Sequence, residues 1–460
     1  MKKLSIYILA SAIMMAGCKK TFDDSINGQK PDDRIAAAMA AYQTKLSKAP
    51  FGWIVLETTT GTAFNQGVSQ DGPVASFAYY MEFNDSNKVS MFSDFDTSMA
   101  VVPKISDYRL KSLQRPALIF DTYSYLHVPC DPNPAISKSP FGVGYGWGTD
   151  FEFSFADNID PSLLGDTIHL TGNLNSASAL MVKATKEQHD AYYAGGLKTT
   201  MLSWGNILNY FKRVTGGPTL FELTPGLGGT KSVDINWLNA AGNLQSASSS
   251  IYFTANGVNL VNTPTIGNQT IKSFNNIVWN AGTATITTTV NGTTASTITG
   301  STTPLKNDPN APLAWWNKAA NIGEYWVSTT NFHVNGVDDA FKVSALASYA
   351  GFSVFWPEFG VSGGINYDLV SPILAVNGQA TISFGAAYRP PNFTAAGTVI
   401  FPFLGTLGTV PASATATFTA LRQKIAEPAG YYLILKEDKV TYDMVNVADA
   451  KSWINWIWVF

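Results

Sequence analysis

The sequence contains few of the residues on which metal sites, disulfide scaffolds and nucleophilic enzymes depend. It has 2 cysteines, 4 histidines and 14% charged residues, whereas charged residues make up about a quarter of a typical globular protein. It contains no His-Glu-x-x-His motif and no P-loop, so the usual signatures of zinc peptidases and nucleotide enzymes are absent. We therefore predict no metal, no cofactor and no catalytic residue from the sequence.

Excess positive charge is also missing. Without Lys2 and Lys3, which lie in the leader described below, the chain has 28 basic and 33 acidic residues and a net charge of −5. A nucleic-acid-binding protein needs a basic surface to neutralise phosphates. Nucleic acid is therefore excluded as an expected partner.

The longest uncharged apolar run near the start is too short to span a bilayer. It covers residues 4–16, whereas a membrane-spanning helix needs about 20 residues. Two lysines precede it and Ala16-Gly17-Cys18 follows, which resembles the lipobox of bacterial lipoproteins. We expect residues 1–17 to be a cleaved signal peptide, Cys18 to be lipidated and to anchor the chain to a membrane, and residues 18–30 to be a flexible tether.

The other cysteine is not expected to react. If Cys18 carries lipid, Cys130 has no partner for an intrachain disulfide. His127 is near it in the sequence, but a catalytic thiol needs a base that is adjacent in space. We interpret Cys130 as a small, partly buried residue.

Apolar and aromatic residues are plentiful, at 45% and 13%, and the 443 residues after the leader suggest two or three domains. Ile35, Met39, Tyr42 and Leu46 recur at helical spacing. This stripe predicts an amphipathic helix over residues 32–47 that packs against the first β-domain.

The remaining sequence indicates a mainly β protein with a few short helices. From Gly52 to Lys183 apolar residues alternate with polar ones, as in Phe151, Phe153 and Phe155, which predicts an antiparallel meander closed as a barrel or a sandwich. Trp204, Leu208 and Phe211 then recur at helical spacing and interrupt this pattern. We predict an N-terminal helix plus β-domain over residues 31–200 and one or more β-rich domains over residues 201–460.

Three Asn-Gly pairs predict hairpins in the second half. A two-residue type I′ turn at Asn256-Gly257 places Ala255 opposite Val258 and puts the apolar residues of both strands on one face. Strict pairing about Asn291-Gly292 puts Ile298 on the wrong face, so we expect a bulge or a longer loop there. Asn377-Gly378 repeats the signal.

Several segments occur in an order that resembles a known family. They are 50–53, 118–123, 126–127, 148–153 and 166–172, and they follow the lipobox and the helix. This order resembles a family of Bacteroidetes lipoproteins, the domain of unknown function four-three-zero-two, most clearly over residues 31–184. The resemblance implies an envelope lipoprotein, often found beside outer-membrane nutrient-uptake components and metallopeptidase-type lipoproteins, and it implies no catalytic residues. The charged segment after Cys18 loosely resembles the one that routes Bacteroidetes-type lipoproteins to the cell surface, so we expect an outer-membrane, surface-exposed protein.

One glycine-rich loop is a candidate ligand contact. Tyr145 and Trp147 alternate with glycines between Phe141 and Gly148. Flanking glycines leave aromatic faces uncovered, and such faces stack on sugar rings. The alternative is that the aromatic rings turn inward and close the end of the barrel.

Two function classes remain open. The first is an accessory protein of nutrient uptake that binds a ligand, such as a glycan, or an outer-membrane uptake component. The second is a hydrolase of glycans or peptides whose site is not visible in the sequence. A deep cleft with convergent carboxylates of raised pKa would favour the hydrolase.

Overall fold

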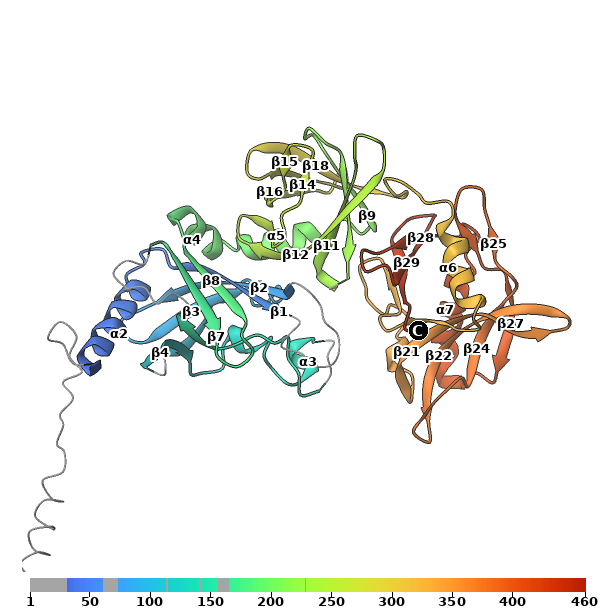
Figure 1. Cartoon of the computed structure of the whole chain (residues 1–460), viewed down its shortest axis with the longest axis horizontal. Helices are drawn as coiled ribbons and strands as arrows, with labels where there is room; N and C mark the ends of the chain where they lie inside the picture. The colour runs from blue at the N-terminus through green and yellow to red at the C-terminus, as the bar shows by residue number, and fades with distance from the viewer. Residues whose placement is uncertain (1–30, 61–72, 113–114, 140–142, 156–164, 228) are drawn as a thin grey trace, which may run out of the picture.

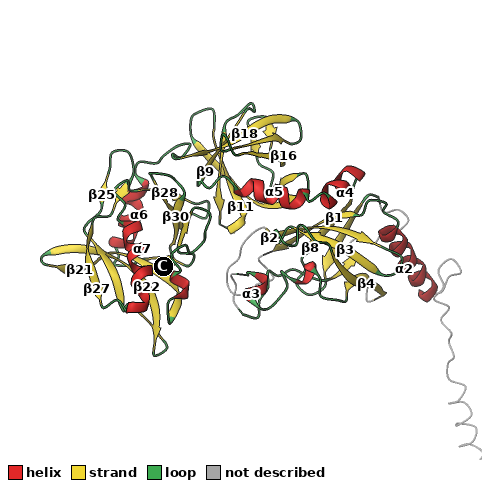
Figure 2. Ribbon diagram, turned by 180° about the vertical axis from the view of Figure 1, so that it is seen from behind, coloured by secondary structure: helices red, strands yellow, loops and turns green. Residues whose placement is uncertain are grey.

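The computed structural model describes residues 31–60, 73–112, 115–139, 143–155, 165–227 and 229–460. This part of the chain forms two closed antiparallel barrels and a 12-stranded sheet, which follow one another along the sequence (Figure 1). Figure 2 shows that helices are few and short beside the strands. The predicted mainly β, antiparallel architecture is therefore confirmed. Cys18, the signal peptide and the tether lie outside the described residues.

The predicted N-terminal helix is α2 (Pro31–Ser47), and only its second half packs on the barrel. Tyr42 and Leu46 are buried in the barrel's apolar core, and the Tyr42 ring stacks on Phe155 with centroids 3.7 Å apart. Ile35 is 41% exposed, so the prediction that the whole stripe is buried was wrong. The last turns of the helix cover the apolar core of the first barrel, and the first turns extend past the edge of this core.

The first barrel is a meander of eight antiparallel strands that closes when β1 pairs with β8, from Trp53 opposite Lys183 to Thr58 opposite Ser178. A 3-10 turn, η2 (Tyr125–His127), and a short helix, α3 (Pro134–Ser137), lie between β5 and β6. The strands are β1 (Trp53–Thr60), β2 (Pro73–Phe83), β3 (Lys88–Ser93), β4 (Lys104–Ser112), β5 (Pro116–Phe120), β6 (Glu152–Phe155), β7 (Thr167–Gly172) and β8 (Ser178–Lys183).

Two helices, α4 (Lys186–Tyr193) and α5 (Gly196–Gly205), connect the barrels. The helical spacing of Trp204, Leu208 and Phe211 was misleading, because the helix ends at Gly205 and Phe211 begins strand β9. Phe211 pairs with Ser301 of the last strand of the second barrel. Phe211 is therefore in a strand because the barrel closes through it, although the local sequence pattern favours a helix.

The second barrel also has eight antiparallel strands and closes between β18 and β9. A two-stranded hairpin, β14 (Thr265–Ile266) with β15 (Gln269–Thr270), is attached to it. The barrel strands are β9 (Phe211–Thr215), β10 (Phe221–Gly226), β11 (Gly229–Leu238), β12 (Leu244–Thr254), β13 (Gly257–Leu260), β16 (Ser273–Asn280), β17 (Thr285–Val290) and β18 (Thr294–Ser301).

The register at the first Asn-Gly pair differs from the prediction. Thr254 pairs with Gly257 and Phe253 with Val258, so Ala255 and Asn256 form the turn and Ala255 is not opposite Val258. Neither Asn256 nor Gly257 has a positive φ. A Cβ at Gly257 would lie 2.3 Å from the carbonyl oxygen of Phe274, so this glycine permits close approach of β16. The register moved by two positions, which keeps the apolar side chains on one face.

The other two hairpins follow their predictions. Val290 pairs with Thr294 and Ile286 with Ile298, so the loop after Val290 has three residues and Ile298 faces the core, as the longer-loop alternative required. At the third site Val376 pairs with Gln379, and Asn377 and Gly378 both have a positive φ. Positive φ at both central residues is the requirement of a type I′ turn.

The C-terminal unit is one antiparallel sheet with two helices, α6 (Ala311–Ala320) and α7 (Thr415–Ile425), packed into its apolar core. Two 3-10 turns, η4 (Val343–Ala345) and η5 (Ala412–Ala414), complete it. Its strands are β19 (Trp326–Ser328), β20 (Phe332–Val334), β21 (Tyr349–Ser362), β22 (Ile365–Val376), β23 (Gln379–Thr381), β24 (Phe384–Tyr388), β25 (Asn392–Phe393), β26 (Val399–Ile400), β27 (Phe403–Gly408), β28 (Tyr431–Leu435), β29 (Thr441–Asn446) and β30 (Ser452–Ile457).

The two barrels are joined by a buried carboxylate as well as by apolar packing. Asp94 follows β3 in the first barrel and accepts hydrogen bonds from the backbone N–H groups of Ala78 at 2.8 Å and Phe253 at 2.9 Å. Lys231 of the second barrel places its Nζ 2.8 Å from the same carboxylate. Since Asp94 contacts strands of both barrels, it fixes their relative position.

Candidate functional site

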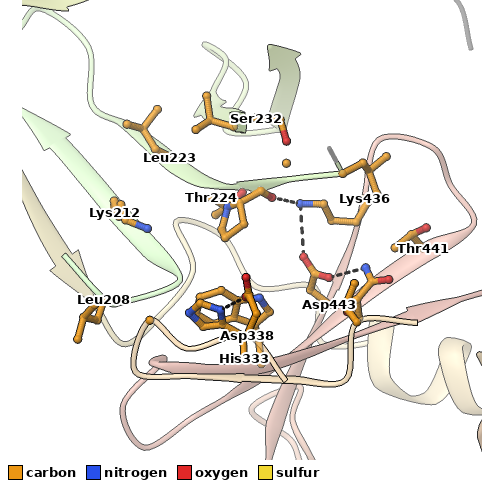
Figure 3. Close-up of a pocket in the computed structure, with 18 of the residues that line it drawn as sticks. Leu208, Lys212, Leu223, Thr224, Ser232, His333, Asp338, Lys436, Thr441 and Asp443 are labelled. Atoms are coloured by element: carbon orange, nitrogen blue, oxygen red, sulfur yellow. Dashed lines mark hydrogen bonds and ion pairs between the residues drawn. The ribbon is translucent and has the colours of Figure 1, made fainter. Parts of the chain in front are cut away.

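A cleft of about 680 Å³ lies between the second barrel and the C-terminal sheet (Figure 3). One wall comes from β9, β10, β11 and the segment before them, and the other from β20, β29, β30 and the turn after β28. The labelled side chains of the barrel wall are Leu208, Lys212, Leu223, Thr224 and Ser232, and those of the sheet wall are His333, Asp338, Lys436, Thr441 and Asp443.

A buried ion cluster holds the two walls together. Lys436, at the turn after β28, places its Nζ 2.6 Å from Asp234 of the barrel and 3.4 Å from Asp443 of the sheet. It also donates a hydrogen bond to the carbonyl oxygen of Pro225. The lysine side chain is 1% exposed and each carboxylate 6%. Burial alone would lower the pKa of Lys436, but Asp443 and Asp234 together hold it above its ordinary value.

A tyrosine strengthens the same junction. The Tyr210 hydroxyl donates to Asp443 Oδ2 at 2.6 Å, and Asn455 Nδ2 donates to Asp443 Oδ1 at 2.8 Å. Burial and the nearby Asp443 carboxylate raise the pKa of Tyr210 well above its ordinary value. Tyr210 also packs in an apolar cluster with Phe211 and residues of the C-terminal sheet. This end of the cleft is therefore rigid, and its carboxylate is already fully engaged.

A second polar group lies on the sheet wall. His333 and Trp453 are opposite each other on β20 and β30, and their rings stack with centroids 3.8 Å apart. His333 Nδ1 is 2.6 Å from Asp338 Oδ1, and this hydrogen bond lowers the pKa of Asp338. The stacking and the hydrogen bond fix the imidazole ring at the edge of the cleft.

The barrel wall contributes one cation with a different environment. Lys212 on β9 donates from Nζ to the carbonyl oxygen of Asn209 at 2.9 Å. Among the described residues, no carboxylate lies within ion-pair distance of Lys212. Burial lowers its pKa to about 8, because the protonated amine loses solvation without gaining an opposite charge.

The carboxyl groups with clearly raised pKa lie elsewhere. Burial raises the pKa of Glu222 to about 7, although Arg213 at 2.8 Å opposes this, and burial raises the pKa of Asp368 to about 7 as well. Neither residue lines the cleft. The described part of the cleft therefore contains no carboxyl group of raised pKa that could serve as a general acid.

The interior of the first barrel is too full to be a site. Its cavity is about 10 Å³, roughly the space of one water molecule. Glu57 inside it accepts a hydrogen bond from the backbone N–H of Asp150 at 2.7 Å, and burial raises its pKa well above the ordinary value. Burial likewise raises the pKa of the Cys130 thiol, which lies 3.0 Å from Thr149 Oγ1. This environment disfavours the thiolate.

The sequence-predicted aromatic pair lies on the first barrel and not in the cleft. Tyr145 is 40% exposed. Trp147 is partly buried, donates from Nε1 to the carbonyl oxygen of Ser137 at 2.7 Å and packs edge-on against Phe77. The structure therefore gives the two rings different environments. Phe141 and Gly142 lie outside the described residues.

Sequence reasoning missed the cleft because its residues come from segments far apart in the chain. Lys212, His333 and Lys436 belong to no short motif, and each occurs in an ordinary strand or turn sequence. The described residues contain no group of three or more His, Cys, Asp or Glu side chains placed to hold a metal ion. Across the same residues, no helix is long and apolar enough to cross a membrane.

Comparison with known proteins gives one clear match. The family model described as "Domain of unknown function (DUF4302)" matches residues 23–281. The matched region ends just after β16. None of the curated proteins matches the chain.

Among solved structures, a mutant of the vaccine antigen Transferrin Binding Protein B from Haemophilus parasuis Hp5 aligns at 8% identity and a TM-score of 0.15, over 88% of this chain and 74% of that one. Intact Ap-TbpB aligns at 10% identity and a TM-score of 0.15, over 88% of this chain and 75% of the Ap-TbpB chain. The DNA polymerase sliding clamp of Caulobacter crescentus aligns at 8% identity and a TM-score of 0.13, over 92% of this chain and 97% of the clamp chain. These similarities are too low to support an argument about function.

Proposed function

The chain belongs to the DUF4302 family of domains of unknown function, and we propose that it is an envelope lipoprotein that binds a small organic ligand in the cleft between its second barrel and its C-terminal sheet. The observation that carries this proposal is the cleft itself. Its volume of about 680 Å³ lies within the range of roughly 300–1,000 Å³ that is typical of small-molecule sites.

The rigidity of the walls supports binding. Lys436 contacts carboxylates of both walls, and Tyr210 binds one of them. Walls that are held in place without ligand lose little conformational freedom when a ligand enters, which favours affinity.

The electrostatics of the cleft favour binding over hydrolysis. A glycosidase needs one carboxyl group of raised pKa near a second carboxylate, and Glu222 and Asp368, whose pKa values are raised to about 7, are not among the lining residues. Asp443 is occupied by Lys436 and Tyr210. The two carboxylates among the described residues that line the cleft, Asp338 and Asp443, are both already engaged by protein side chains, so the hydrolase alternative has no free carboxylate pair there.

The location in the cell remains part of the proposal. Cys18 after the apolar leader supports a lipid anchor, and the tether after it supports display on the surface of the outer membrane. An anchored binding protein at this place would present its ligand to uptake components of the same membrane.

A second contact surface is the loop with Tyr145 and Trp147. Tyr145 is the more accessible ring, so it would carry most of any sugar stacking. Glycan-array signals of the wild type and a Tyr145→Ala variant test this. Equal signals from both proteins would remove the loop from the proposal without affecting the cleft.

Obstruction of the cleft tests the main proposal. Thr330 lines the cleft and is exposed, so Thr330→Trp adds bulk there without disturbing the core. Thr283→Trp on the far hairpin of the second barrel is the matched control, because Thr283 is exposed and outside the cleft. Both changes are made in a soluble Cys18→Ser chain, and binding of a fragment library is followed by ligand-observed NMR.

We expect a set of fragments that bind the wild type and Thr283→Trp and lose at least ten-fold in affinity for Thr330→Trp. Fragments that bind all three proteins equally would place the ligand site elsewhere and contradict the proposal.

A further inference from the structure

The basic side chains of the cleft differ in whether a carboxylate of the protein pairs with them. Lys436 has Asp234 and Asp443 as partners, and His333 has Asp338. Within the described residues, Lys212 has only the backbone carbonyl of Asn209. Among the described residues, the cleft therefore contains one partly buried lysine whose charge no carboxylate of the protein neutralises.

Leaving such a charge uncompensated is costly, because a partly buried ammonium group loses part of its hydration and gains no opposite charge in return. The pKa of Lys212, lowered to about 8 by burial, reflects this cost. The amine is nonetheless mostly protonated at pH 7, so it can attract a negative group. An anion that entered the cleft would supply the missing counter-charge.

We propose that the ligand of the cleft is an organic monoanion whose acidic group pairs with Lys212. This inference rests on the proposed function, since it assigns a chemical class to the ligand of that same cleft. The acidic group is a carboxylate, a sulfate ester or a phosphate diester, all of which carry a single charge and accept charge-assisted hydrogen bonds from an ammonium group.

The opposite wall limits the ligand to a single acidic group. Asp443 and Asp338 lie on that wall (Figure 3), and the basic side chains beside them, Lys436 and His333, are already engaged by these carboxylates. A second negative charge on the ligand would face these carboxylates without a free cation and would be repelled.

Apolar side chains adjoin the lysine and predict the neighbouring part of the ligand. Lys212 pairs with Leu223 in the barrel register, and Leu208 and Trp204 line the same end of the cleft. The group attached to the acid is therefore apolar or ring-shaped, because it must cover these side chains when water leaves.

Matched pairs of probes test the inference. Each pair has an anionic and a neutral member of similar shape: 4-phenylbutyrate with 4-phenylbutyramide, phenyl sulfate with phenol, methyl phenyl phosphate with phenol, and glucuronate with glucose. Dissociation constants are measured by ligand-observed NMR at pH 7 for the wild type, Lys212→Met, Lys212→Arg and Lys272→Met. Lys272 is exposed on the same barrel and outside the cleft, which makes it the matched control.

We expect at least one anionic probe to bind the wild type ten-fold or more tightly than its neutral partner. Lys212→Met should abolish this preference, whereas Lys212→Arg and Lys272→Met should keep it. The pair that shows the preference identifies the acidic group.

Three results would overturn the inference in different ways. Equal binding of anionic and neutral members to the wild type, weakened by Thr330→Trp, would refute the anionic ligand and leave the cleft as a binding site. An unchanged preference in Lys212→Met would assign the anion to another cation. Absence of binding by every probe up to millimolar concentration would contradict both the inference and the proposed function.

A measurement with a minimal anion provides an independent check. The Nζ-methylated lysine signals are followed by NMR, and the Lys212 signal is identified by its loss in Lys212→Met. Methyl sulfate, a monoanion, exchanged for chloride at constant ionic strength, should raise the pH midpoint of the Lys212 signal. An identical midpoint in the two salts would overturn the inference.

Discussion

Tyr210 and Asp443 are 233 residues apart in the sequence, yet the tyrosine hydroxyl donates to Asp443 Oδ2 at 2.6 Å across the junction of the second barrel and the C-terminal sheet. Lys436 lies beside the same carboxylate and also reaches Asp234 of the barrel. The two units are thus joined by charged hydrogen bonds at the base of the cleft, and the cleft depends on that junction for its shape.

Removal of the tyrosine hydroxyl should weaken the junction without breaking it. Tyr210→Phe deletes one hydrogen bond to a charged group, which costs about 1.5–3 kcal/mol, while Asn455 and Lys436 still satisfy the carboxylate. Urea unfolding should show a lower midpoint for Tyr210→Phe. A midpoint equal to that of the wild type would mean that the hydrogen bond adds nothing to stability.

Removal of the lysine should have a larger effect. Lys436→Met leaves Asp234 and Asp443 buried without their cation, and breaking a buried ion pair in this way costs about 3–5 kcal/mol. The exposed Lys198→Met serves as a control and should unfold like the wild type. If Lys436→Met were as stable as Lys198→Met, solvent would have to reach the two carboxylates of the ion cluster.

Replacement of Lys212 should raise stability, whereas replacement of Lys436 should lower it. Because the pKa of Lys212 is lowered, we expect the gain in stability to depend on pH. The folded pKa of about 8 lies below the ordinary 10.5, so the protonated lysine destabilises the folded chain fully below pH 8. This cost decreases as the pH rises from 8 to 10.5 and disappears above that range. Lys212→Met should therefore be more stable than the wild type at pH 7, by up to about 3 kcal/mol.

The difference between the two proteins should close by pH 10.5. Thermal unfolding of both at pH 7 and at pH 10.5 measures it. A stability of Lys212→Met below that of the wild type at pH 7 would mean that the lysine makes a favourable contact in the folded chain.

The lipid anchor leads to a fractionation prediction. Cys18→Ser removes the sulfur that would be acylated, so the protein should move from the membrane fraction to the soluble fraction, because stable anchoring needs acyl chains. A variant that stays with the membranes after a high-salt wash would show that Cys18 is not the anchor.

The fold could be predicted from the sequence to the extent that local periodicity governed it. Alternating residues such as those of β7 gave the antiparallel meander, and Ile298 required the longer loop that the structure has. The prediction failed where tertiary contacts determined the local backbone conformation. Gly257 permits close approach of β16 and does not form a turn, and Phe211 closes a barrel although its spacing is helical.

The candidate site could not be predicted, for a related reason. Lys212, His333 and Lys436 form one cleft only because two separately folded units dock. The property that marks Lys212 is the lack of a carboxylate near a buried amine, and this depends on the three-dimensional surroundings. Tyr145 and Trp147 drew attention because glycines surround them, a local feature that says nothing about where a cavity forms.

A crystal structure of the soluble Cys18→Ser chain with its tightest-binding anionic probe tests the central claim most directly. The account predicts ligand density in the cleft, with the acidic group beside Lys212 Nζ and the remainder against Leu208 and Leu223. Density at another surface, or in the cleft with the acidic group pointing away from Lys212, would contradict it.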